Sequence, residues 1–120
     1  MRVPYEYAAI QAVPRVERGE LINVGVLLYC QLRDFLAART HLDAARLLAL
    51  DPDADLDAIR AALTAWETTC ADGTRGMTLG ERFRWLVAPR STILRAGPVH
   101  MGLAEDPAAE LDRLMTLLVR

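Results

Sequence analysis

The sequence contains no lysine, and all 14 of its basic residues are arginine. Acidic residues number 16, so the formal net charge at pH 7 is −2. A chain without a basic excess lacks the general attraction to phosphate that drives non-specific nucleic-acid binding. Only a local basic patch could therefore serve that kind of function.

Cysteine and long apolar runs are also scarce. The two cysteines, Cys30 and Cys70, lie in apolar stretches, which indicates buried thiols rather than a disulfide. Two cysteines and two histidines at scattered spacing give no metal-site pattern, and we expect neither a metal nor a cofactor. The N-terminus has no signal-peptide core, and no apolar run approaches the roughly 20 residues of a membrane span. We therefore expect a cytoplasmic protein without membrane association.

What the chain has is apolar content: 52% of its 120 residues are hydrophobic. This length fits one domain with a core of its own. We predict a single domain over residues 1–120, strand-rich in 1–42 and helix-rich in 43–120.

Three strands are predicted in the first part, over residues 3–13, 21–30 and 35–41. The second, LINVGVLLYC, is apolar on both faces and should lie inside the sheet. Short connections between these segments favour antiparallel neighbours. One face of the second strand would carry Leu21, Asn23, Gly25, Leu27 and Tyr29, and the other Ile22, Val24, Val26, Leu28 and Cys30.

Helices are predicted next, over residues 44–50, 55–70, 79–88 and 107–119. Asp43, Thr78 and Asp106 are suited to cap three of them, and Glu81 completes a capping box with Thr78. One late strand is predicted over residues 91–96. Trp85 is expected in the core because its helix is apolar.

This order predicts an α+β fold, with a three- or four-stranded antiparallel sheet and helices packed on one face. The face of the second strand that carries Asn23 and Gly25 is harder to place. Either helices cover it too, or it is a docking surface.

Four separated blocks agree, in order, with one family. The blocks VPRVERGELINVGVLLYC, ARLLALDPDADLDAIRAAL, ERFRWLVAPRSTIL and PVHMGL resemble domain-of-unknown-function family 3037 over nearly the whole chain. The matching positions are Pro14, Arg15, Glu20, Asn23, Gly25, Arg82, Phe83, Arg84, Trp85, Pro89, Arg90, Ser91, His100 and Gly102. Members are small bacterial proteins, often encoded beside HipA-like kinase-fold proteins. The resemblance implies an accessory or binding role, and no catalytic assignment comes with it.

Three groups of residues are candidate contacts. The loop of residues 14–20 carries Arg15, Arg18 and Glu20, either as a solvated connection or as a protruding partner contact. His100 lies between glycines, as a structural residue or as a group active near neutral pH. Asn23 interrupts an apolar strand.

The third group is an arginine cluster. Arg82, Arg84 and Arg90, with the Ser91 hydroxyl, could grip a phosphate by charge-assisted hydrogen bonds, or could pair with the acidic residues of 43–57. Arg82 and Arg84 cannot share a helix face, because residues two apart diverge.

Two hypotheses follow, and neither is an enzyme. The first is a non-catalytic binding module that partners a HipA-like kinase-fold protein, with homo-oligomers also open. The alternative is a small nucleic-acid or nucleotide-phosphate binder that uses an Arg/His patch, and hence a phosphate-bearing ligand. A hydrolase using His100 with Glu17 or Glu20 is a third class, but no catalytic motif supports it.

Overall fold

The computed structural model describes residues 1–72, 76–89 and 92–120. Its elements run β1 (Val3–Ala12), β2 (Ile22–Cys30), β3 (Phe35–Thr40), α1 (Ala44–Leu50), α2 (Leu56–Asp72), α3 (Leu79–Val87), β4 (Leu94–Ala96), β5 (His100–Ala104) and α4 (Pro107–Leu118). Within the described residues, no helix is long and apolar enough to cross a membrane.

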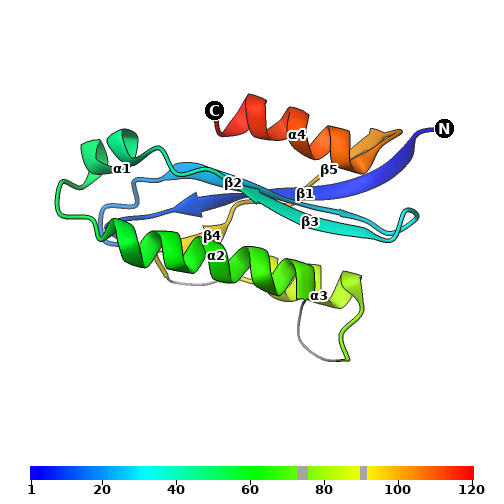
Figure 1. Ribbon diagram of the computed structural model, residues 1–120, viewed down its shortest axis with the longest axis horizontal. Helices are drawn as coiled ribbons and strands as arrows, with labels where there is room; N and C mark the ends of the chain where they lie inside the picture. The colour runs from blue at the N-terminus through cyan, green and yellow to red at the C-terminus, as the bar shows by residue number, and fades with distance from the viewer. Residues whose placement is uncertain (73–75, 90–91) are drawn as a thin grey trace.

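All five strands form one antiparallel sheet (Figure 1). Its order is β3-β2-β1, and both β4 and β5 pair with the remaining edge of β1. The α+β class, the antiparallel sheet and the interior position of residues 21–30 are confirmed. The sheet has five strands where three or four were predicted, because residues 100–104, for which no strand was predicted, pair with β1.

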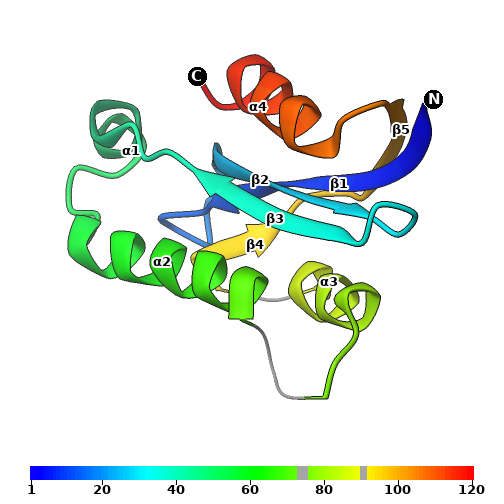
Figure 2. The same ribbon diagram turned by 45° about the vertical axis from the view of Figure 1, so that its right-hand side comes forward.

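Helices lie on both faces of the sheet rather than on one (Figure 2). On one face, α2 and α3 close a core that contains Ile10, Leu27 and Phe83. On the other face, α4 packs over β2 and β3 and closes a second core around Leu28 and Leu111. Of the two possibilities left open for the Asn23 face, the structure therefore shows a helix covering it.

A β-bulge changes which side chains share a face. The pairing between β1 and β2 shifts between Ile10 and Gln11, where Gly25 and Asn23 are the partners and Val24 is the extra residue. An extra residue reverses the alternation of side chains beyond it. Val24 consequently joins the core under α2 and α3, whereas Val26 faces α4. The two faces predicted by strict alternation are wrong on one side of the bulge.

The helix ends follow the sequence signals. Asp43 accepts a hydrogen bond from the Arg46 amide, Thr78 and Glu81 form the capping box, and Asp106 accepts from the Ala108 amide ahead of Pro107. Each cap satisfies amides that the first turn leaves without a helical partner. The late strand is shorter than predicted, Leu94–Ala96, and residue 91 of that prediction lies outside the described part of the chain.

Candidate functional site

The predicted loop residues are paired within the protein. Arg18 binds Glu20 with its Nε 2.5 Å from Oε1, and Arg15 approaches the buried carboxylate of Asp51 at 3.5 Å. The hydrogen bond from Arg18 lowers the pKa of Glu20. These pairs tie the loop to itself and to Asp51 at the end of α1.

Asn23 and His100 line one small cleft of about 190 Å³ on the α4 face, together with Tyr7 and Gln11. The His100 ring lies beside the Tyr7 ring, with centroids 5.4 Å apart. The Asn23 amide donates to the Leu118 carbonyl at 3.1 Å and so ties the end of α4 to the sheet. These two predicted residues converge, but Asn23 already has a structural partner.

The described arginines of the predicted patch do not converge. Arg82 donates to the Cys70 carbonyl at 2.9 Å, and Arg84 binds Glu6. Glu6 and Tyr7 are successive strand residues, whose side chains point to opposite faces. Arg84 and His100 therefore lie on opposite faces of the sheet. Arg90 and Ser91 lie outside the described residues.

The hydrolase arrangement is not assembled either. His100 pairs with Tyr7, whereas Glu17 and Glu20 follow the far end of β1 at Ala12. Ala12 lies five positions after Tyr7, which corresponds to roughly 16 Å along the strand. Burial raises the pKa of the Cys70 thiol to about 12, so this cysteine is a poor nucleophile near neutral pH. Among the described residues, no three His, Cys, Asp or Glu side chains are grouped to hold a metal ion.

The structure instead reveals a surface on the α3 side of the sheet that the sequence did not indicate. Two neighbouring hollows of about 140 and 630 Å³ share Glu6, Tyr29 and Gln31 in their walls. Because they share these residues, the hollows form one continuous surface. We call it the Glu6 surface and define it by Glu6, Leu32, Arg84, Trp85 and Met101, which line the hollows. Leu103 is added to it because it follows Met101 on the same face of β5.

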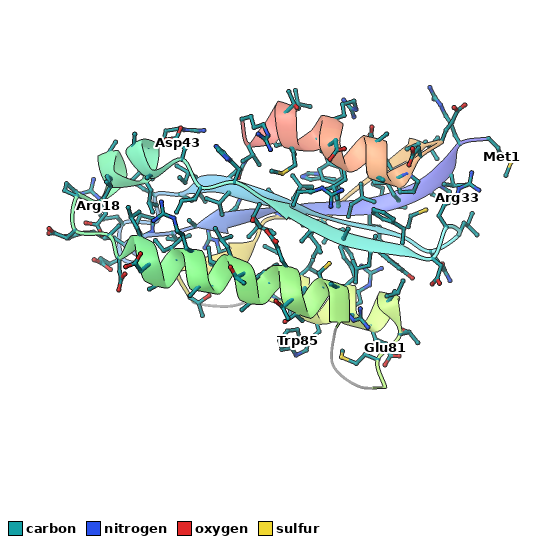
Figure 3. All side chains as sticks on the ribbon, in the orientation of Figure 1. Met1, Arg18, Arg33, Asp43, Glu81 and Trp85 are labelled. Carbon is teal, nitrogen blue, oxygen red and sulfur yellow. The ribbon has the colours of Figure 1, made fainter. Side chains whose placement is uncertain are left out.

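Large apolar side chains are exposed across the Glu6 surface. Met101 is 73% exposed, Leu32 68%, Leu103 58% and Trp85 49%. Figure 3 shows Trp85 at the outer margin of the layer formed by α2 and α3, rather than in the core as the sequence suggested. Single exposed apolar residues are ordinary, whereas a contiguous group of them, especially one rimmed by polar residues, is typical of an interaction site.

A two-pronged ion pair lines the larger hollow beside Trp85. The two terminal guanidinium nitrogens of Arg84 donate to the two carboxylate oxygens of Glu6 at 2.7 Å. This hydrogen bonding raises the pKa of Arg84. The pair joins β1 to α3 and fixes both side chains, so the surface presents a neutral, rigid polar centre.

On the opposite face, Tyr5 is buried under α4 and donates its hydroxyl hydrogen to Glu110. Burial first, and then this hydrogen bond, raise the pKa of Tyr5 from 10.0 to about 12. A folded-state pKa above the unfolded value means that the neutral phenol stabilises the fold fully below pH 10. That contribution is lost as the pH rises through about 12.

We therefore expect one tyrosine to ionise near pH 12 when tyrosinate absorbance is followed against pH. The Tyr5→Phe variant should lack this late step. Ionisation of every tyrosine in one step near pH 10 would contradict the burial of Tyr5.

Comparison with known proteins gives one family. The model of DUF3037, a family of proteins of unknown function, matches residues 7–119. The chain belongs to DUF3037. The matched region includes Tyr29 and Gln31, which line both hollows, and also Arg84, Trp85 and β5. Glu6 lies one residue before the matched region. Searches of the curated proteins and of the solved structures found no match.

Proposed function

We propose that this DUF3037 protein is a non-catalytic, cytoplasmic binding module whose Glu6 surface docks a HipA-like kinase-fold protein. The observation that carries the proposal is the exposure of three large apolar side chains, Leu32, Trp85 and Met101, in the hollows that contain the Glu6–Arg84 pair, with Leu103 exposed beyond Met101. The DUF3037 assignment supports the choice of partner only through the gene neighbourhood that the family resemblance implies.

A protein suits this surface better than a small molecule does. The hollows lie on a surface with exposed apolar walls, and Trp, Met, Leu and Arg are side chains that a protein partner can cover together. Aromatic residues, Met and Arg are enriched in protein interfaces, and their central members carry most of the binding energy. A partner that covers the Glu6–Arg84 pair would also strengthen it, because exclusion of water lowers the local dielectric constant.

Leu32 offers a sharp test because it lies in the β2–β3 turn, 68% exposed, where substitution leaves the cores intact. We expect Leu32→Glu to weaken binding of the co-expressed kinase-fold protein at least about tenfold, since a charge would be buried without a partner. The measurement is titration calorimetry on the purified proteins.

The matched control is Leu117→Glu on α4, where the same side chain is 65% exposed on the other face. This variant should bind as the unchanged protein does. Equal loss in both variants, or no complex between the unchanged proteins at micromolar concentration, would refute the proposal.

A further inference from the structure

Strand β5 forms an edge of the sheet. Among the described strands it pairs with β1 alone, and Figure 2 shows it at the margin of the sheet beside β1. Natural edge strands are protected by charged residues, proline or bulges. The sequence of β5, HMGLA, contains no Asp, Glu, Lys, Arg or proline, and its register with β1 runs without a shift.

The backbone groups that face outward can be assigned. The Gly97 amide donates to the Ala9 carbonyl at 2.8 Å, so odd-numbered residues of β1 direct their polar backbone groups toward β4 and β5. Tyr7 pairs with His100 and Tyr5 with Gly102, so these even-numbered residues of β5 face β1. The amide and carbonyl groups of Met101 and Leu103 consequently point away from the sheet.

We propose that two copies of this chain pair antiparallel through β5, about a two-fold axis at Gly102. In this register each Met101 lies opposite Leu103 of the partner, and the two residues exchange both backbone hydrogen bonds. Their side chains, 73% and 58% exposed in the single chain, pack against each other on the α3 side. The closest approach of the two strands falls at glycine, where no side chain obstructs it.

Backbone complementarity favours a second copy as the occupant. In this register the outward amide and carbonyl of Met101 meet the carbonyl and amide of Leu103 in the other copy, and the two-fold axis repeats the exchange. Within β5, no acidic or basic side chain opposes the approach of an identical strand.

The pairing joins the two Glu6 surfaces into one continuous apolar face, because Met101 belongs to that surface and Leu103 of the partner extends it. The inference nevertheless stands without the proposed kinase-fold partner. It requires the free edge of β5, whereas partner binding is tested at Leu32, which lies in a turn at the end of β2, on the other side of β1 from β5.

Sedimentation velocity on the isolated protein, from roughly ten micromolar to one millimolar, tests the pairing. We expect a reversible dimer with a dissociation constant on the order of 10–100 µM, as suits a small interface. Met101→Lys and Leu103→Lys should each weaken it at least about tenfold, since a charge on an edge opposes pairing. Leu117→Lys, on α4, should leave it unchanged, and circular dichroism shows whether each variant is folded.

A further measurement tests the register. Equimolar Met101→Cys and Leu103→Cys variants should form a disulfide much faster when mixed than either alone, because opposite residues of such a pair have Cα atoms about 5.5 Å apart. A monomer throughout the concentration range, a dimer unaffected by both lysine variants, or equal cross-linking in mixed and separate samples would overturn the proposal.

Discussion

Replacement of Phe83 by alanine is expected to lower the free energy of unfolding by about 3–5 kcal/mol. The Phe83 side chain is fully buried and stacks on Tyr29 with ring centroids 5.4 Å apart. It is the main apolar anchor that holds α3 against the sheet, and alanine would leave a cavity that the strands cannot fill. A loss of this size is a large part of the roughly 5–15 kcal/mol that a domain has in total.

Urea unfolding followed by circular dichroism measures this loss, with Trp85→Ala as the control on the same helix. Trp85 is the larger side chain but is 49% exposed, so its removal should cost less than half as much as that of Phe83. If the two variants lose equal stability, the packing of α3 described here is wrong, and the position of Arg84 and Trp85 in the Glu6 surface with it.

The second large effect is expected at Gly25, beside the bulge in β2. A Cβ atom at this position would lie 2.5 Å from the Arg39 carbonyl oxygen, and 3.1 Å from Cδ1 of Ile10. The carbonyl belongs to the β3 backbone, which cannot move away without loss of the pairing between Gly25 and Thr40. We expect Gly25→Ala to lower the free energy of unfolding by about 3 kcal/mol, at the upper end for overpacked cores.

Gly80→Ala is the matched control for this prediction. There the added Cβ would lie 2.9 Å from Tyr29 Oη, the outer end of a half-buried side chain rather than a backbone atom of the sheet. Alanine also favours the helix by up to about 1 kcal/mol relative to glycine, so the net change should lie within about 1 kcal/mol. A similar loss at both glycines would show that close approach of the β3 backbone is not what requires Gly25.

The element types were readable from the sequence where local chemistry decides them. Asp43, Thr78 and Asp106 cap helices as predicted, since capping depends on a few adjacent residues. The bulge at Val24 was not readable, because its position is set by pairing with Ile10 and Gln11 rather than by the strand itself. Strand β5 escaped prediction because HMGLA is short and contains glycine, and only β1 beside it makes it a strand.

The candidate surface depends still more on tertiary structure. Glu6 and Arg84 lie 78 positions apart, and no spacing rule connects them. One signal was available: Glu6 is the one charged residue in β1, whose other residues except Gln11 are apolar or aromatic, and this suggests a specific partner. Asn23 and His100 were singled out individually and do meet in a cleft, whereas Met101 and Leu103 carried no sequence signal beyond their apolarity.

Docking through the Glu6 surface is tested most directly by hydrogen–deuterium exchange of this protein with and without the purified kinase-fold partner. We expect slower exchange in the partner's presence at the start of β1, in the turn that contains Leu32 and in α3. Exchange in α4, on the other face, should be unchanged. A complex that protects α4 and leaves α3 and the Leu32 turn unaffected would contradict the assignment of this surface.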